Sequence, residues 1–394
     1  MGSHGLKNQI AIVGMGCTRF GQHHDRGLDD LLVDAAVDAY ESAGIRQDQV
    51  DAYWLGTFGS SAAGTTLSRP LKIGYKPVSR NENYCATGSD AFRNACYAVA
   101  SGAYDVALAI GAEHMSDPGV AGIPFTHPFS DGTRLDISAP GSYSYLFTAY
   151  ATKYGIDKKD LKDAISHVAW KNHENGAGNP RAHLRMRVSK EALAAAPPLA
   201  GHLSLFDCGG LSDGAAAAVI VRAEDALEYT DHPIYLRGLS FVTGPGTGAM
   251  DPGYDFSTFP EVVASRREAF GQAEVSSRDQ IGMAEVHDCF TITELILMED
   301  LGFADRGTAW KEVLAGSFDR DGALPVNPDG GLKSFGHPLG ASGIRMIFEC
   351  WLQLRGEAGD RQLDLAGRYA ITQNLGGYPG ECVSFVSVWG ADRG

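Results

Sequence analysis

The sequence lacks any apolar run long enough to cross a membrane. A helix needs about 20 consecutive apolar residues to span a bilayer, and no segment of the 394 residues approaches that length. Residues 9–16 are apolar but short and contain Gly14 and Gly16, which favours a first β-strand over a signal peptide. We therefore expect no membrane partner and a cytoplasmic location.

The sequence also has too little positive charge for a general nucleic-acid or anionic-membrane partner. It holds 33 Lys and Arg residues against 48 Asp and Glu residues, a net charge of −15. A ligand that carries phosphate would need a local basic patch. The candidate patch consists of Lys171, Arg181, Arg185, Arg187 and Lys190. The alternative is that these residues form a solvated charged face of a helix.

Paired cysteines are missing as well. The seven cysteines are odd in number and none is in C-x-x-C spacing, which argues against a disulfide framework and against a zinc site within the chain. We therefore expect reduced thiols and no bound metal. The seven are Cys17, Cys85, Cys96, Cys208, Cys289, Cys350 and Cys382.

What is present is typical of an α/β protein with two units. The chain is 44% hydrophobic and 21% charged, and it is longer than one ordinary core needs. Apolar runs such as 104–110 and 214–221 read as buried strands, and they alternate with helical patterns such as 27–43 and 340–354. We predict an N-terminal half at 8–114 and 205–228, an inserted segment at 115–204, and a C-terminal half at 233–392.

Three short segments carry residues suited to nucleophilic acyl chemistry. Cys85 lies in the turn Asn83–Ser89, directly before a predicted helix at 90–101 whose N-terminus should lower the pKa of the thiol, with Asp90 as the cap. His337 lies in the glycine-rich segment 327–343. For each residue the alternative is structural, a buried cysteine or a turn histidine.

The third segment is His287-Asp-Cys-Phe290, which follows a β-like run. His287 and Cys289 are two residues apart, so on a strand they would share a face. A neutral imidazole and a thiol can both transfer protons. The alternative is a histidine at a strand end and a core cysteine.

These segments, in this order, resemble the thiolase superfamily and its sterol-carrier-protein-2-type branch. Further matches are Lys171-Asn172-His173 with Asn179-Pro180, Leu205-Phe-Asp-Cys208 and Ser212-Asp-Gly-Ala-Ala216, so the resemblance spans nearly the whole chain. It implies a thiolase fold: two similar βαβαβαββ halves that form a layered α-β-α-β-α core, with an inserted loop domain that caps the site.

The resemblance also implies roles for the residues. Cys85 would be the acylated nucleophile, His337 its base, His287 the group that polarises the thioester oxygen, and Cys289 the second acid/base. An oxyanion hole would come from the N–H groups of Cys85 and of Gly376-Gly377. The implied reaction is thiolytic cleavage of a 3-oxoacyl-CoA, or the reverse Claisen condensation, with coenzyme A as substrate, no tightly bound cofactor, and Lys171, Arg181 and Arg185 as CoA contacts.

The segment Asn374-Leu-Gly-Gly-Tyr378 departs from the wider superfamily. Other branches carry their second catalytic cysteine where Asn374 stands, and Cys289 replaces it in the resembled branch. Tyr378 has no such counterpart, and its phenol would line the acyl pocket or act as an acid/base. The alternative function is therefore a thiolase-like retro-aldolase that cleaves a β-hydroxyacyl-CoA of the steroid side-chain type and relies on tyrosines.

The inserted segment is rich in aromatic residues, which favours a bulky substrate such as a benzoylsuccinyl-CoA type; core or dimer contacts are the alternative. These aromatics are Phe125, Phe129, Tyr143, Tyr145, Phe147 and Tyr150. The resemblance further implies a homodimer with residues 104–110 near the interface, and an accessory subunit with a zinc ribbon and an OB-fold.

Overall fold

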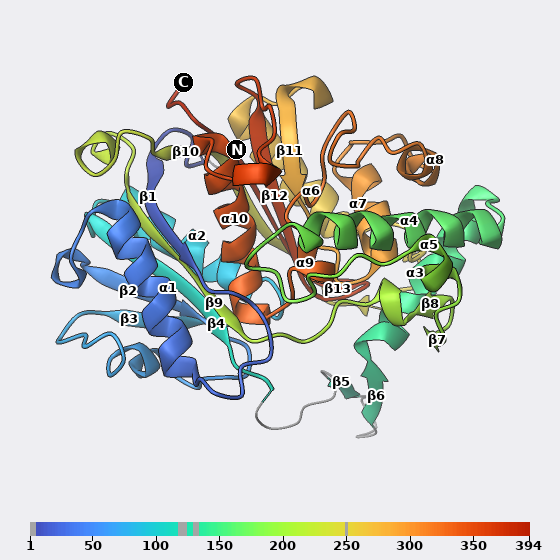
Figure 1. Cartoon of the computed structure of the whole chain (residues 1–394), viewed down its shortest axis with the longest axis horizontal. Coiled ribbons are helices and arrows are strands. Elements are labelled where there is room, and N and C mark those ends of the chain that lie inside the picture. The colour runs from blue at the N-terminus through green and yellow to red at the C-terminus, as the bar shows by residue number, and fades with distance from the viewer. Residues whose placement is uncertain (1–4, 117–123, 129–133, 249–250) are drawn as a thin grey trace.

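A mixed β-sheet runs through the molecule (Figure 1). The computed structural model describes residues 5–116, 124–128, 134–248 and 251–394, and in them this sheet has nine strands in the order β11-β12-β13-β10-β1-β9-β4-β2-β3. The strands are β1 (Ile10–Cys17), β2 (Ala52–Gly56), β3 (Val78–Asn81), β4 (Val106–Glu113), β9 (Gly214–Arg222), β10 (Ile234–Thr243), β11 (Ile281–Glu285), β12 (Tyr369–Tyr378) and β13 (Glu381–Gly390).

The sheet consists of two halves with the same pairing pattern. In the first half β2 is parallel to β4, which is antiparallel to β9, which is antiparallel to β1. In the second half β11 is parallel to β12, which is antiparallel to β13, which is antiparallel to β10. The antiparallel pair β1–β10 joins the halves. The predicted α/β class with two similar halves is confirmed.

Helices cover both faces of the sheet in each half. The helices are α1 (Leu28–Ala43), α2 (Thr87–Ala100), α3 (Ala139–Tyr154), α4 (Lys158–Ala177), α5 (Lys190–Ala194), α6 (Pro260–Ala273), α7 (Thr291–Asp300), α8 (Ala309–Leu314), α9 (Gly331–Ser334) and α10 (Leu339–Arg355). Helix α1 packs on β1 and β9, α6 packs on β10 and β13, and α2 packs against α10 between the two halves. Figure 1 shows α10 at the centre of the molecule. The layers are therefore α-β-α-β-α.

The central pair α2–α10 explains how two distant turns reach one site. Helix α2 precedes β4 and α10 precedes β12, and these two strands have the same place in the pairing pattern, so α2 and α10 occupy equivalent positions in the repeat. They pack closely because a Cβ at Gly88 would collide with the carbonyl oxygen of Gly340, and one at Gly343 would collide with the side chain of Ser89. The turns before these helices carry Cys85 and His337, which are brought together by this packing.

Most of the inserted segment packs on the second half. Helix α4 contacts α7, α8 and α9, and α3 contacts α7 and β12. Two short hairpins, β5 (Pro124–Pro128) with β6 (Arg134–Ser138) and β7 (Pro198–Ala200) with β8 (Leu203–Ser204), belong to the same segment. The division into 8–114 with 205–228, 115–204 and 233–392 stays a prediction. Among the described residues, no helix is both long and apolar enough to span a bilayer.

Two local predictions were wrong. Strand β11 ends at Glu285, so His287 and Cys289 lie on the turn before α7 and do not share a strand face. Helix α2 begins at Thr87 with Ala86 as its N-cap, so Asp90 does not cap it. Asp90 instead accepts hydrogen bonds from the side-chain amides of Asn81 and Asn83 and so anchors the Cys85 turn.

Candidate active site

Cys85 lies on a tight turn between β3 and α2. Tyr84, the residue before it, has a positive φ of 52°, an uncommon backbone conformation for a side chain of that size. The N–H of Asn83 donates to Thr87 Oγ1 at 2.8 Å, and the N–H of Ala86 donates to the carbonyl of Asn83 at 3.1 Å. These bonds hold the turn, and Cys85 keeps partial exposure to solvent.

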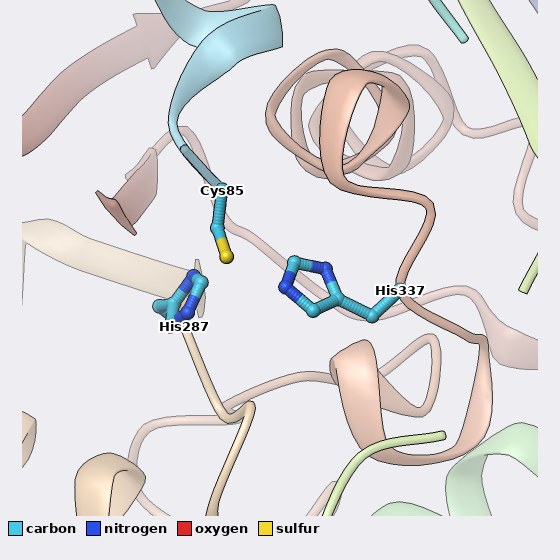
Figure 2. A group of neighbouring side chains, drawn as sticks. All are labelled: Cys85, His287 and His337. Carbon is cyan, nitrogen blue, oxygen red and sulfur yellow. The ribbon is translucent and has the colours of Figure 1, made fainter. Parts of the chain in front are cut away.

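Two imidazoles lie beside this thiol. Figure 2 shows the Cys85 sulfur and the rings of His287 and His337 pointing toward one another. The Sγ atom and one ring nitrogen of each histidine all lie within 4.8 Å of one another. The two rings are nearly perpendicular, at 84°, with their centroids 5.4 Å apart. The fold therefore brings together three of the four predicted catalytic residues. The same sulfur and nitrogen atoms are the donors that a zinc ion prefers.

Each imidazole is held at its Nδ1 atom. His337 Nδ1 contacts Ser342 Oγ at 2.7 Å, and His287 Nδ1 contacts Asn374 Nδ2 at 3.0 Å. Neither Nε2 atom has a hydrogen-bond partner among the described residues, although both are buried. A buried polar atom without a partner is uncommon in a folded protein. The two Nε2 atoms are therefore the groups available to a substrate.

The pKa of Cys85 differs from the sequence prediction. Burial raises the pKa of the Cys85 thiol to about 12, and the carboxylates of Glu113 and Glu82 add to the increase. The N-terminus of α2 does not lower this pKa below its ordinary value, because the loss of solvation outweighs the nearby backbone N–H. The thiol is therefore protonated at neutral pH and needs a base when it attacks.

Both histidines are neutral. Burial lowers the pKa of His337 to about 3, and the positive charge of Arg345 lowers it further. Burial also lowers the pKa of His287 well below the ordinary value, with smaller contributions from His337 and Arg345. A neutral imidazole can accept a proton through one nitrogen and donate one through the other.

Cys289 lies near the other thiol. It is buried, and its pKa is raised well above the ordinary value, first by burial and then by Cys85 and Asp288. The carbonyl oxygen of Cys289 accepts a hydrogen bond from the N–H of Gly209 at 2.8 Å, which fixes the turn. Its role as the second acid/base stays a prediction.

A buried polar network links the turns that carry His287 and His337. The carboxylate of Asp288 accepts hydrogen bonds from the N–H groups of Leu332 at 2.6 Å and Lys333 at 3.1 Å, shortly before His337. The Asn327 side chain accepts from the N–H of Val286 at 2.8 Å. These bonds fix the relative positions of the two imidazoles.

Lys171 belongs to this network, which overturns its predicted place in a phosphate patch. Its ammonium lies 2.9 Å from Glu294 Oε1 and donates to Asn172 Oδ1 at 2.6 Å and to the carbonyl of Val326 at 2.7 Å. Only 2% of Lys171 is exposed. The prediction was wrong because a basic residue on a helix was assumed to face solvent, whereas this one neutralises a buried carboxylate.

The other members of the predicted patch do not form one cluster of free cations. Arg181 donates from Nε to the carbonyl of Cys17 at 2.8 Å, Arg187 pairs with Glu174, and Lys190 lies over the ring of Trp170. Arg185 is exposed, and its contact with CoA stays a prediction.

Gly376 and Gly377 lie beside the Cys85 turn, at the end of β12. A Cβ at Gly376 would collide with the carbonyl oxygen of Asn83, so only glycine fits this approach. The carbonyl of Gly377 accepts a hydrogen bond from the Tyr143 hydroxyl at 3.0 Å. This proximity is what the predicted oxyanion hole needs, and the hole itself stays a prediction.

Tyr378 is half-buried, and its hydroxyl donates to Glu381 Oε2 at 2.7 Å. Burial and this carboxylate raise the pKa of the phenol above its ordinary value. The phenol is thus held protonated, which makes it a hydrogen-bond donor and a poor base.

The aromatic residues of the inserted segment have different environments. Tyr143 packs against Phe290, the residue after Cys289, with the ring centroids 4.6 Å apart and the rings tilted by 32°. Phe147 and Tyr150 are fully buried core residues, whereas Tyr145 is exposed. Phe129 and the side chain of Phe125 lie outside the described residues. Only Tyr143 is therefore shown near the site.

Sequence reasoning missed Ser342, Asp288 and Glu294 and gave Asn374 no role. Ser342 follows His337 by five residues, across the start of α10, and Asp288 lies between two predicted catalytic residues. The signal present in the sequence was an acidic residue directly beside a predicted catalytic histidine, which indicates a hydrogen-bonded network if both are buried.

Comparison with known proteins gives consistent matches along the chain. The family described as "Thiolase, N-terminal domain" matches residues 10–224, and the family described as "Thiolase C-terminal domain-like" matches residues 251–387. An acetyl-CoA acetyltransferase of Methanothermobacter thermautotrophicus is 35% identical over 94% of this chain and 97% of its own.

Two further relatives and one solved structure are similar over most of the chain. Human sterol carrier protein 2 is 30% identical over 93% of this chain and 70% of its own. The benzoylsuccinyl-CoA thiolase subunit BbsB of Thauera aromatica is 29% identical over 94% and 96%. The solved Ltp2-ChsH2(DUF35) aldolase has a TM-score of 0.80 at 23% identity, covering 99% of both chains, which shows a shared fold.

Proposed function

The chain belongs to the thiolase family and is an acyltransferase, and from this membership and the geometry at Cys85 we propose that it cleaves a 3-oxoacyl-CoA with coenzyme A, or runs the reverse Claisen condensation, through an acyl-cysteine intermediate. The observation that carries the proposal is the cluster of one thiol and two imidazoles within 4.8 Å. Such a thiol is activated by an adjacent base.

The first half-reaction forms the acyl-enzyme. The Cys85 sulfur attacks the 3-oxo carbon while His337 accepts the thiol proton, and the Sγ–C3 bond forms. The C2–C3 bond then breaks, its electron pair leaves with the acetyl-CoA unit as an enolate, and Cys289 protonates that carbon. His287 and the backbone near Gly376 stabilise the negative oxygens. A well-placed donor of this kind contributes about 10²–10³-fold in rate.

The second half-reaction releases the product. The Cys289 thiolate, formed in the first step, takes the proton of a CoA thiol, whose sulfur attacks the acyl-Cys85 carbonyl. The S–C bond to Cys85 breaks, and the Cys85 sulfur recovers its proton from His337. Both thiols and both imidazoles end the cycle in their starting state.

Intact-protein mass spectrometry tests the covalent step. The protein, with an acyl-CoA and any accessory subunit, should gain the mass of one acyl group, and Cys85→Ala should abolish the gain. Absence of a Cys85-dependent adduct would exclude the acyl-enzyme mechanism. The Cys17→Ala variant is the matched control, because Cys17 is a buried core residue outside the cluster of Cys85, His287 and His337 and should leave the adduct unchanged.

The proposed substrate carries a bulky or aromatic acyl group. Support comes from Tyr143 and Phe290, which lie together beside the Cys289 turn, and from the relative whose name gives benzoylsuccinyl-CoA. A panel of acyl-CoA substrates is the test. A clear preference for acetoacetyl-CoA over aromatic 3-oxoacyl-CoA would refute this part of the proposal.

The proposed assembly is a homodimer with an accessory subunit. The name of the Thauera relative calls it a subunit, and the similar aldolase structure contains a DUF35 partner. An acidic chain whose candidate basic patch is mostly paired internally suits a partner that supplies phosphate contacts. Light scattering at micromolar concentration should give at least a dimer; a monomer would contradict it.

A second candidate is the retro-aldol cleavage of a β-hydroxyacyl-CoA. The observation in its favour is the protonated phenol of Tyr378, held by Glu381 beside the glycine pair, together with the fold shared with the aldolase. This reaction needs no acyl-enzyme. The mass-spectrometry experiment therefore separates it from the thiolase reaction.

A further inference from the structure

The two imidazoles at the site have chemically different partners at Nδ1. His337 contacts a hydroxyl, that of Ser342, and His287 contacts an amide, that of Asn374. The Nε2 atom of each ring has no partner among the described residues. In a neutral imidazole one nitrogen carries the proton and the other a lone pair. The Nδ1 partner therefore decides what each Nε2 offers a substrate.

Ser342 makes Nε2 of His337 an acceptor. The Ser342 hydroxyl donates its one proton to the carbonyl of Pro338 at 2.9 Å. Its contact with His337 Nδ1 must then be a hydrogen bond that the ring donates and the oxygen accepts. With the proton on Nδ1, the lone pair is on Nε2, toward Cys85.

Asn374 makes Nε2 of His287 a donor. The amide nitrogen of Asn374 can only donate, so Nδ1 of His287, 3.0 Å away, accepts and Nε2 carries the proton. In this orientation the other amide atom is also satisfied, because the Ser89 hydroxyl donates to Asn374 Oδ1 at 2.9 Å. Ser89, Asn374 and His287 are all 0% exposed, so water does not compete for these groups.

We propose that Asn374 and Ser342 are positioning residues that fix the two neutral imidazoles in opposite tautomers, which makes His287 the hydrogen-bond donor to the oxyanion and His337 the acceptor of the Cys85 proton. This inference rests on the proposed function for its consequences in catalysis. The opposite tautomers are needed because two acceptors would repel a developing oxyanion, and two donors would leave the thiol without a base.

The same arrangement bears on metal binding. A zinc ion needs the lone pair of each nitrogen that it binds. With its proton on Nε2, His287 offers no lone pair there, so the cluster of Cys85, His287 and His337 is one ligand short. A side chain at position 374 that accepts a proton from Nδ1 would complete the set.

The test variant is Asn374→Asp, with Asn374→Ala as the matched control. The Asp carboxylate accepts from Nδ1–H and moves the proton of His287 away from Nε2. Nitrogen NMR of the ligand-free protein, labelled at histidine, should show Nε2–H for His287 and Nδ1–H for His337 in the wild type. In Asn374→Asp the His287 signal should change to Nδ1–H.

Zinc affinity distinguishes an effect of residue 374 on the His287 tautomer from a general effect on the fold, because only the first would make the protein bind zinc more tightly. In competition with a chromophoric chelator, Asn374→Asp should bind Zn²⁺ at least about 10-fold more tightly than the wild type, the usual size of such an orienting effect. Cys85→Ala in the same background should remove the gain. The kcat for acyl transfer should fall about 10²–10³-fold with a smaller change in KM.

Two results would overturn the inference. One is an Nδ1–H tautomer of His287 in the wild type, and the other is a tautomer and a zinc affinity that Asn374→Asp leaves unchanged. Both measurements use the ligand-free protein, so they do not depend on the reaction. Failure of the acyl-Cys85 adduct would reject the proposed function while leaving the tautomers intact.

Discussion

The side-chain amide of Asn172 on α4 donates to the carboxylate of Asp288 at 2.7 Å, and it also donates to Glu294 Oε2 at 2.8 Å. Asp288 in turn binds the N–H groups of Leu332 and Lys333. One amide from the inserted segment thus reaches both imidazole-bearing turns. Burial raises the pKa of Asp288 to about 7, with Glu294 as the next cause, whereas the hydrogen bonds from Leu332 and Lys333 lower this pKa and so favour the ionised carboxylate.

Asn172→Ala should destabilise the protein and reduce its activity. The substitution leaves a buried carboxylate short of a donor, which typically costs about 1–3 kcal/mol of unfolding free energy. Misplaced imidazoles should lower kcat more than they raise KM. Denaturant unfolding and steady-state kinetics measure the two effects. The control is Lys159→Ala on the same helix, whose exposed pair with Asp163 contributes little; equal stability of the two variants would contradict the prediction.

The rate at which Cys85 is alkylated should keep rising with pH and should not level off near neutral pH. Burial raises the pKa of its thiol to about 12, so the reactive thiolate is a small fraction at neutral pH and grows as pH rises. The rate with iodoacetamide, followed by peptide mass spectrometry, should rise with pH through the range in which the protein stays folded. A plateau below the ordinary thiol pKa of 9.0 would show that the helix terminus outweighs burial.

Gly111→Ala and Gly271→Ala should change stability in opposite directions. A Cβ at Gly111 on β4 would collide with the carbonyl of Gly340 in α10, and overpacking of this kind typically costs about 1–3 kcal/mol or more. Gly271 lies inside α6 with open space around it, so Ala there should stabilise the helix by about 0.5–1 kcal/mol. Thermal unfolding of both variants is the measurement. A neutral Gly111→Ala would mean that β4 and α10 have room to separate.

Periodicity alone located most of the sheet and its helices, because buried strands and amphipathic helices leave patterns in the sequence. The strands containing Val106–Ile110 and Gly214–Val221 are in the structure, as is the central helix of residues 339–355. Motif resemblance then named Cys85, His287 and His337, whose side chains do lie together in the structure.

What periodicity could not reveal is the partner of each polar group. The sequence predicts Lys171 as a surface cation. It does not show that the side of α4 that carries Lys171 packs against a distant carboxylate, that of Glu294. Likewise, the pKa of Cys85 depends on how completely the surrounding chain removes water, which no local motif encodes. The contact of Asn374 with His287 joins residues that are 87 positions apart, so no local pattern reveals it.

Cys289→Ala and His337→Ala should fail at different steps. If Cys289 is the second acid/base, its loss should still allow the transfer of an acyl group from an acyl-CoA donor to Cys85, because a CoA thiolate can leave without a proton. It should block turnover, because the enolate carbon formed when the C2–C3 bond breaks then has no proton donor. His337→Ala should slow acylation itself, since the protonated thiol then has no base. A lost proton-transfer group typically costs about 10²–10⁴-fold. Near-normal thiolysis by Cys289→Ala would reject its role.

Tyr378→Phe separates the two candidate reactions within one protein. The substitution removes only the hydroxyl that donates to Glu381 and keeps the ring. If the protein is a thiolase, thiolysis should change by much less than the effect of Cys289→Ala, because no step of that reaction passes a proton through the phenol. If it is a retro-aldolase, cleavage of a β-hydroxyacyl-CoA should be lost in Tyr378→Phe and kept in Cys85→Ala and Cys289→Ala. The thiolase assignment predicts instead that both cysteine variants lose thiolysis. Assays of the three proteins on both substrate classes decide between the two reactions.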